Sequence, residues 1–338
     1  MSLTRQDWRK ILPGIAVSLL ALAVIFYWVD FQRLGQALQL ADYGYIALLF
    51  LISLVWIGVR GLVWRALLQE QASYSQVFLT LNEGYLLNNL LPFRLGEVGR
   101  AFLLGRKANL EFLQVVSTVL IERAMDVAFA AGLLLTTLPF VVGGGLAREA
   151  AISAGALVLA GLFGLHLLAR NQAWASRRFE ALSVRLPILR RFIGAQQLDA
   201  FFAGLAALVD GQRFLKALLL MTLNWAIAVG QFYVLLRAFF PQARLLWAPF
   251  TVSVMALGIA APSSPGAVGV LELAIMGALS AFKLDASTAL AAALTAHLTN
   301  YLITGVIGAF ALLKDGLTLS GVFREVRQIS PPKPGESD

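Results

Sequence analysis

Long apolar runs, separated by short and mostly basic polar segments, dominate the pattern along the chain. The runs cover residues 11–29, 43–68, 77–91, 112–142, 150–169, 214–239, 246–261, 266–282 and 286–313. A helix needs about 20 apolar residues to cross about 30 Å of hydrocarbon. In lipid, a single segment can satisfy the hydrogen bonds of its own backbone N–H and C=O groups only as a helix. The pattern therefore predicts an all-α, polytopic membrane protein with about six full spans.

Three runs, at 77–91, 246–261 and 266–282, are too short or too interrupted to be ordinary spans. The break at 88–100 reads NNLLPFRLGEVGR, and the break at 261–272 reads APSSPGAVGVLE. Their prolines stop a helix, and non-helical backbone at membrane depth is tolerated only where protein or a water-filled cavity surrounds it. We expect two re-entrant helical hairpins. The alternatives are a cytoplasmic turn for the first break and a simple kink or extramembrane turn for the second.

Lysine and arginine gather on one side of the predicted membrane. Arg5, Arg9 and Lys10 precede the first run, which ends in the interface-type sequence FYW and is predicted to be an uncleaved span. With the N-terminus inside, most of the 27 Lys and Arg residues, Arg60 among them, fall on the inner side. Those left outside are Arg33, Arg148, Arg237, Arg244 and Lys283. The asymmetry predicts a plasma (inner) membrane protein with both termini in the cytoplasm.

Composition excludes several other classes of protein. Hydrophobic residues make up 59% of the chain and charged residues 14%, too few charges to form the surface of a soluble domain. The net charge of +8 is explained by the inner basic collar, so we expect no nucleic-acid partner. With no cysteine and two histidines, the chain offers no thiol chemistry and no multi-histidine metal site. We expect no metal and no cofactor.

Two membrane halves and a basic insert are predicted. The first half covers residues 1–169, with an inner hairpin around 77–107, and the second covers 214–314, with an outer hairpin around 246–282. A basic, amphipathic insert at 170–213 is expected to lie on the cytoplasmic surface. Residues 315–338 form a charged, proline-rich cytoplasmic tail. The similar order of elements, starting inside in one half and outside in the other, predicts an inverted repeat.

Three charged residues interrupt the run at 112–142. Glu122 and Asp126 share a helix face, and Arg123 lies three residues before Asp126. One charge at the centre of a membrane helix costs about 2.5 to 3.5 kcal/mol on insertion scales, so these groups must face partners or water. They form either a functional ion-pair cluster or a purely structural one.

Three motifs, in this order, carry a resemblance to a known family. They are Asn88-x-x-Leu91-Pro92-x-Arg94-x-Gly96-Glu97-x-x-Arg100, Glu122-Arg123-x-x-Asp126 and Pro262-x-x-Pro265-Gly266-x-x-Gly269-x-x-Glu272. Across nearly its whole length the chain resembles the transmembrane, flippase-type region of lysylphosphatidylglycerol synthase and the stand-alone membrane proteins grouped with it. Ala267 departs from the family, which usually has a second glycine there, and the aminoacyl-transferring domain of the full synthase is missing.

The resemblance implies lipid translocation or a related lipid-handling role and does not imply lysyl transfer. Archaeal relatives are associated with dolichol-linked sugars, so the headgroup class varies. The function we expect is transport of a polar-headed lipid, anionic or glycosylated, between leaflets. The alternatives are a membrane-embedded lipid-modifying transferase, with Glu97 or Asp126 as general base, and a non-catalytic partner of a separately encoded lipid-modifying enzyme. Because no G-x-x-x-x-G-K-[ST] motif occurs, ATP-driven transport by this chain alone is not expected.

Each candidate site residue has an expected role. Arg94 and Arg100 would hold phosphate, and Glu97 would orient them or pair with Arg123. Headgroup hydroxyls would bind Asn88, Ser263 and Ser264, whereas Gly266 and Gly269 would let the backbone approach closely. Glu122, Asp126 and Glu272 are candidates for proton coupling. His297 is expected to be a satisfied packing residue.

Six of these ionisable groups are expected to converge on one water-accessible cavity between the hairpins. They are Arg94, Glu97, Arg100, Arg123, Asp126 and Glu272, and their formal charges sum to zero. Each would be costly if it faced lipid alone, so mutual placement removes most of the cost.

Overall fold

The computed structural model describes residues 5–91, 94–141, 195–205, 208–260 and 264–317, together with single residues between 149 and 178. Within these residues the chain is helical and contains no strand, which confirms the all-α class. The elements are α1 (Arg5–Trp28), α2 (Phe31–Leu40), α3 (Tyr43–Leu67), α4 (Tyr74–Leu90), α5 (Leu95–Ala108), α6 (Phe112–Val141), α10 (Ala195–Leu205), α11 (Gly211–Phe239), α12 (Trp247–Ala260), the 3-10 helix η3 (Pro265–Ala267), α13 (Val270–Ser280) and α14 (Ala286–Lys314).

Four helices, α3, α6, α11 and α14, are long and apolar enough to cross a membrane. A fifth span is possible if α1 and α2, which meet at an angle of 85°, count as one. Most of the predicted span at 150–169 and most of the basic insert lie outside the described residues. Aspartate side chains accept backbone N–H groups at the starts of α2, α3, α11 and α14, which explains why these helices begin where they do.

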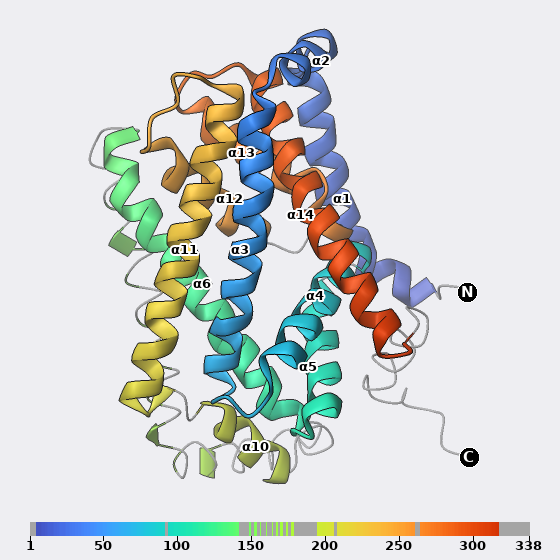
Figure 1. Cartoon of the computed structure of the whole chain (residues 1–338), viewed down its shortest axis with the longest axis vertical. Coiled ribbons are helices and arrows are strands. Elements are labelled where there is room, and N and C mark those ends of the chain that lie inside the picture. The colour runs from blue at the N-terminus through green and yellow to red at the C-terminus, as the bar shows by residue number, and fades with distance from the viewer. Residues whose placement is uncertain are drawn as a thin grey trace.

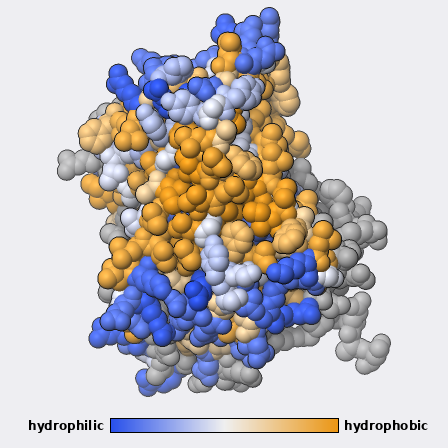
Figure 2. All heavy atoms as spheres, in the orientation of Figure 1, coloured by the Kyte–Doolittle hydropathy of each residue, from blue (hydrophilic) through white to orange (hydrophobic). Residues whose placement is uncertain are grey.

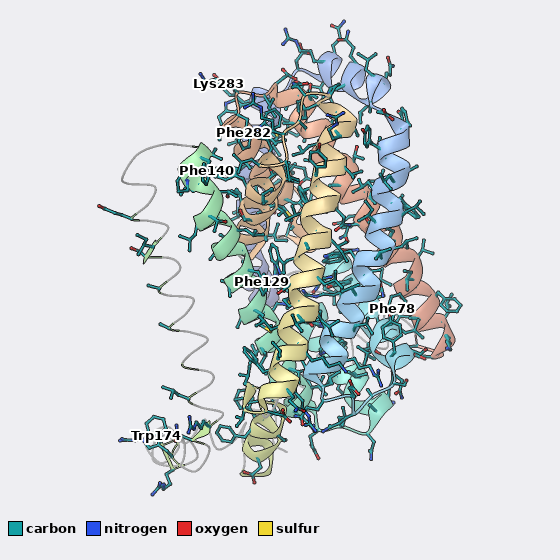
Figure 3. The ribbon with its side chains drawn as sticks, turned by 60° about the vertical axis from the view of Figure 1, so that its left-hand side comes forward. Phe78, Phe129, Phe140, Trp174, Phe282 and Lys283 are labelled. Carbon is teal, nitrogen blue, oxygen red and sulfur yellow. The ribbon has the colours of Figure 1, made fainter. Side chains whose placement is uncertain are left out.

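An apolar band crosses the middle of the face seen in Figure 2, and hydrophilic residues gather at both ends of that face. Large apolar side chains point outward from the long helices, among them Leu51, Leu219 and Val306, which are 59 to 67% exposed. Phe140 projects from the end of α6, whereas Phe129 in the same helix stacks on Trp225 of α11 (Figure 3). A continuous apolar exterior of this kind suits lipid and not water, so this is an integral membrane protein.

Buried small residues let the helices approach one another closely. Ala289, Ala291, Ala292 and Ala293 line the buried face of α14, against α11 and α13. Trp64, Leu81, Leu104 and Val115 form a second core between α3, α4, α5 and α6.

Two helical hairpins enter the molecule from opposite ends (Figure 1). The α4–α5 hairpin enters from the end where α10 lies, called here the α10 end, and α12, η3 and α13 enter from the α2 end. Their α-helices have 11 to 17 residues and are too short to cross about 30 Å of hydrocarbon. The two tips meet between the long helices, where Arg94 Nη2 donates to the Ile259 carbonyl at 2.5 Å.

This arrangement has the form of re-entrant hairpins, and it does not resemble turns outside the helix bundle. The breaking residues Pro92, Pro262 and Ser263 lie outside the described residues. The opposite entry of the hairpins is the order of elements that an inverted repeat requires. The repeat itself stays a prediction, because its element at 150–169 is mostly not described.

At the α10 end, a buried ion pair ties the first hairpin to the end of α14. Lys107 Nζ donates to Glu83 Oε2 at 2.6 Å and to Thr80 Oγ1 at 3.0 Å, and it also pairs with Asp315. Burial alone would raise the pKa of Asp315, but hydrogen bonds with Lys107 and Glu83 hold that pKa below its ordinary value. The contact joins α4, α5 and α14 at one point.

Glycines allow the two helices of the first hairpin to touch. A Cβ atom on Gly96 would lie 2.0 Å from the Gly84 carbonyl oxygen and 2.6 Å from Asn88 Oδ1. The Gly96 N–H donates to that Asn88 oxygen at 2.8 Å. The backbones therefore leave no room for any side chain at residue 96.

Gly96→Ala is expected to destabilise the protein, because backbone must move to admit the methyl group. Overpacking of this kind costs about 1 to 3 kcal/mol, and the gain in helix propensity, at most about 1 kcal/mol, offsets only part of it. A thermal melt in detergent measures the effect. The matched control is Gly132→Ala in α6, where an added Cβ meets nothing within 4 Å. Equal melting temperatures for the two variants would contradict this packing.

Candidate functional site

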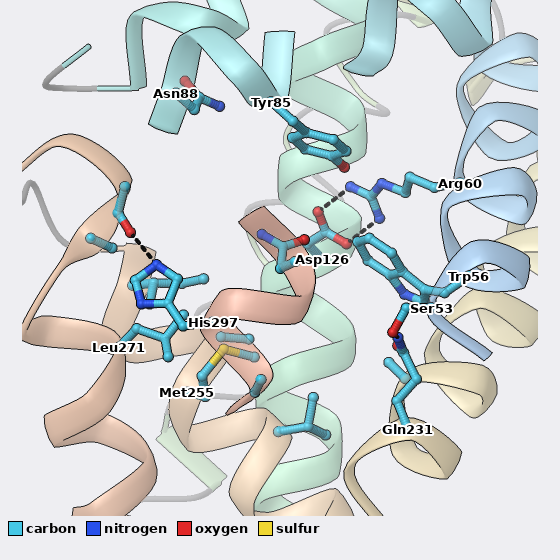
Figure 4. Close-up of a pocket in the computed structure, with 18 of the residues that line it drawn as sticks. Ser53, Trp56, Arg60, Tyr85, Asn88, Asp126, Gln231, Met255, Leu271 and His297 are labelled. Atoms are coloured by element: carbon cyan, nitrogen blue, oxygen red, sulfur yellow. Dashed lines mark hydrogen bonds and ion pairs between the residues drawn. The ribbon is translucent and has the colours of Figure 1, made fainter. Parts of the chain in front are cut away.

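A cavity of about 530 Å³ lies where the hairpin tips meet α3, α6, α11 and α14 (Figure 4). Its charged lining residues are Arg60, Arg94, Glu97, Arg123 and Asp126. Amides (Asn88, Asn89, Asn224, Gln231, Asn300) and aromatic side chains (Trp56, Tyr85, Trp225, Phe232, Tyr301) supply much of the remaining wall. The rest is mainly aliphatic, including Leu49, Val252 and Ile275. The cavity thus combines a charged face with an apolar one.

Glu122 is the centre of an ion-pair cluster on the α6 side of the cavity. This carboxylate is 0% exposed and accepts from Arg60 Nη2 at 2.6 Å, from Arg100 Nη2 at 2.9 Å and from Arg123. Asp126 receives two bonds from Arg60, at 2.5 and 2.8 Å, and lies 3.2 Å from Arg123 Nη2. The structure therefore brings Glu122, Arg123 and Asp126 together, with further arginines around them.

Glu97 joins the two hairpin helices to this cluster. Its Oε2 lies 2.6 Å from Arg100 Nη2, and its Oε1 lies 3.7 Å from Arg123 Nη1. Asn88 donates to Glu97 Oε1 at 3.4 Å, so the amide holds the carboxylate and lines the cavity. Pairing between Glu97 and Arg123 is one of the two roles expected for Glu97.

Arg94 and Arg100 occupy different environments, although the sequence predicts the same role for both. Arg100 is 1% exposed, its guanidinium lies over the Trp64 ring at 4.5 Å, and Glu97 and Glu122 neutralise it. Arg100 is buried, pairs with two carboxylates and does not line the cavity, so the expected phosphate contact of Arg100 is corrected to a structural role. Arg94 lines the cavity, and among the described residues it donates to the Ile259 carbonyl and has no carboxylate within 4.0 Å.

The second hairpin presents its tip to the same cavity. Ser264 and Gly266 line it, whereas Gly269 packs on α1, where an added Cβ would lie 3.0 Å from the Ser18 carbonyl oxygen. Gly266 has φ +64° and is covered by the Tyr301 hydroxyl, which leaves no room for a side chain. Ala267 adopts φ 57°, so the turn keeps a left-handed conformation at the position where the family usually has glycine.

Glu272 lies outside the arginine cluster. Its Oε1 is 2.5 Å from His297 Nδ1, and its Oε2 accepts the Gly269 N–H at 2.8 Å, which caps the start of α13. His297 lines the cavity and Glu272 lies behind it. The expected convergence of six ionisable groups is therefore corrected: Arg94, Glu97, Arg123 and Asp126 line the cavity, Arg100 is buried beside it, and Glu272 pairs elsewhere.

The model of the lysylphosphatidylglycerol synthase TM region matches residues 11–308. The chain belongs to this family. The match includes both hairpins, the long helices and every residue that lines the cavity. Each hairpin motif of this family member thus contributes side chains to one shared cavity.

Three curated proteins to which the chain is similar are distant relatives, at 24 to 25% identity. Glycosyltransferase AglD of Haloferax volcanii is 24% identical over 365 residues, which is 94% of this chain but 56% of AglD, so the chain spans little more than half of that relative. A UPF0104 membrane protein of Methanothermobacter thermautotrophicus is 24% identical, with 95% of this chain and 98% of the relative covered. One from Methanocaldococcus jannaschii is 25% identical over 66% of this chain and 91% of the relative. No solved structure matches the chain.

Arg60 is a site residue that the sequence does not place among the candidates. Its position near the end of an apolar run suggests the cytoplasmic side, but the structure buries it to 2% exposure within α3, between Glu122 and Asp126. Arginine favours the cytoplasmic side of a membrane, but this rule does not distinguish an arginine whose side chain extends to the membrane interface from one whose side chain points into the helix bundle. A usable signal is present: two carboxylates and one arginine on the α6 face need a further cation.

The corrected site carries a net positive charge. Arg60, Arg94, Arg100 and Arg123 stand against Glu97, Glu122 and Asp126, so four guanidinium groups face three carboxylates. This replaces the neutral set expected from sequence, because Arg60 and Glu122 enter the site and Glu272 leaves it. Among the described residues, no group of three or more His, Asp or Glu side chains is placed to hold a metal ion. The site is therefore suited to an anion.

Proposed function

We propose that this protein is a lipid transporter of the plasma membrane, which moves a polar-headed lipid, anionic or glycosylated, between the two leaflets. The observation that carries the proposal is the cavity at the meeting of the two hairpin tips, whose lining combines an apolar surface with a charged one that includes Arg94, an arginine paired with no described carboxylate. A lipid headgroup and the first part of its chains need these two surfaces side by side. Membership of a family named after the membrane region of a lipid synthase supports the same conclusion.

In this proposal Arg94 binds the phosphate, because its guanidinium offers several N–H donors, and the bond that it makes with a described residue is to a carbonyl and not to a carboxylate. The excess positive charge of the cluster favours one negative charge on the headgroup. Amides and aromatic rings such as Asn88, Asn300 and Trp56 suit hydroxyl-rich groups. Arg100 and Glu122, beside the cavity, and Glu97, in its wall, act as positioning residues that hold α5 and α6 together.

Purified protein in liposomes tests the proposal. A fluorescent phosphatidylglycerol is placed in both leaflets, and an impermeant quencher then reports how fast inner lipid reaches the outside. Faster exchange than in protein-free liposomes, with no change in the lipid mass, is the expected result. A new lipid product on addition of a donor would identify a transferase instead, an alternative favoured by the name of the AglD relative. If neither occurs, a role as partner of a separate lipid-modifying enzyme remains.

Orientation is tested with single cysteines, which the cysteine-free chain makes direct. Gln39 at the α2 end and Gln212 at the α10 end are both exposed. We expect an impermeant thiol reagent to label Gln39→Cys in intact cells and to label Gln212→Cys only after the membrane is opened, because the α10 end carries the basic collar. Labelling of Gln212→Cys from outside would reverse the proposed orientation.

A further inference from the structure

Glu272 and His297 form a buried pair at the tip of the second hairpin, separate from the arginine cluster. They are 4% and 6% exposed. His297 on α14 holds two partners at once: Nδ1 lies 2.5 Å from Glu272 Oε1, and Nε2 lies 3.0 Å from the Gly266 carbonyl oxygen. The imidazole thus connects α14 with both η3 and α13, and one edge of it faces the cavity (Figure 4).

Hydrogen-bond valency dictates how many protons this arrangement needs. A carbonyl oxygen only accepts, so Nε2 must carry a hydrogen. The contact between Nδ1 and Glu272 needs a second hydrogen, carried by the imidazole or by the carboxyl group. The pair therefore holds one proton more than a neutral imidazole beside an ionised carboxylate. Without that proton, lone pairs would face each other in one of the two contacts.

We propose that Glu272 and His297 together form a proton-binding site, whose proton holds the tip of the second hairpin against α14. When the proton leaves, either Gly266 or Glu272 loses its bond to His297, and the tip is released from α14. The tip also carries the Ile259 carbonyl bonded to Arg94. An anion that captures Arg94 and a proton that binds His297 therefore act on the same hairpin. The coupling role of this proton rests on the proposed function.

Few other charged or titratable groups surround the pair. Tyr301 of α14 packs its ring against the imidazole, with ring centres 4.3 Å apart. Arg94 and Tyr85 of the first hairpin line the same cavity. On the α1 side, the described contacts of this tip come from Ser18, Ala21 and Leu22, which do not titrate. Glu272 and His297 are thus each other's direct titratable partners.

Nuclear magnetic resonance of the whole chain in lipid nanodiscs tests the site without any transport assay. The chain has two histidines, so His166→Gln leaves ¹⁵N-labelled His297 as the single imidazole signal. From about pH 5 to about pH 8 we expect Nε2 to stay protonated while the Nδ1 signal changes as one proton leaves. In Glu272→Gln that change should move or disappear, since the partner that shares the proton is gone.

Signals that stay constant across this range would overturn the proton site, and so would an unchanged transition in Glu272→Gln. The His166→Gln protein decides the matter alone if Glu272→Gln does not fold. For coupling, the probe is fluorescent phosphatidylglycerol in liposomes with a pH gradient. The gradient should accelerate transport by the His166→Gln protein, and His297→Gln should lose this response. A lipid transport rate that is the same with and without the pH gradient would overturn the coupling. If no lipid moves, the proposed function falls with it, but the resonance result on the proton site stands.

Discussion

Replacing Arg94 with glutamine is expected to abolish most lipid transport while leaving a folded protein in the membrane. Hydrogen bonds to charged groups contribute about 1.5 to 3 kcal/mol, so losing the guanidinium should lower the transport rate by about 10- to 100-fold. The fold should survive, because among the described residues Arg94 makes no ion pair and donates to one carbonyl, that of Ile259. Fluorescent lipid exchange gives the rate, and a thermal melt gives the stability.

The matched control is Arg244→Gln, which removes the same charge from the exposed loop between α11 and α12. We expect this variant to transport at the rate of the unaltered protein. Arg94→Lys should be intermediate, because an ammonium keeps the charge but loses the forked geometry. Normal transport by Arg94→Gln would refute the role of the cavity even though the membrane architecture would stand.

The sequence was sufficient to predict helices, breaks and the charged motifs, since each follows from a local rule. Apolar runs long enough to span are visible directly, and α3, α6, α11 and α14 lie where the pattern predicts them. Glu122 and Asp126 are spaced for one helix face. Their need for partners follows from the cost of burying charge.

Which partner each charge finds depends on packing between distant segments, and periodicity does not contain that information. Arg60 meets Asp126 across 66 residues of chain, and Arg94 meets Ile259 across 165. Sequence reasoning therefore grouped Glu272 with the arginines, although its partner is His297. Periodicity likewise does not show that Trp64, Glu97 and Glu122 enclose the Arg100 side chain, and the sequence therefore predicts a ligand-binding role for this residue.

Glu122→Gln is expected to have the largest effect on stability of any single change in the cluster. Glu122 is fully buried and is shared by Arg60, Arg100 and Arg123, so the neutral amide leaves excess positive charge with no water to solvate it. Removing one partner of a buried ion pair costs about 3 to 5 kcal/mol, a large part of the 5 to 15 kcal/mol that typically separates folded from unfolded protein. Loss of folded protein, or a much lower melting temperature, is the expected measurement.

Asp126→Asn is the matched comparison, because this carboxylate also pairs with Arg60 and Arg123 but its side chain is 20% exposed toward the cavity. Water in the cavity can solvate the remaining arginines, so the loss should be smaller than for Glu122→Gln. Combining Glu122→Gln with Arg60→Gln removes one charge of each sign and should restore part of the lost stability, since contacting residues are coupled. Two results would show that Glu122 does not neutralise the cluster. One is a double variant that loses more stability than the two single variants lose together, and the other is a Glu122→Gln protein with the melting temperature of the unaltered protein.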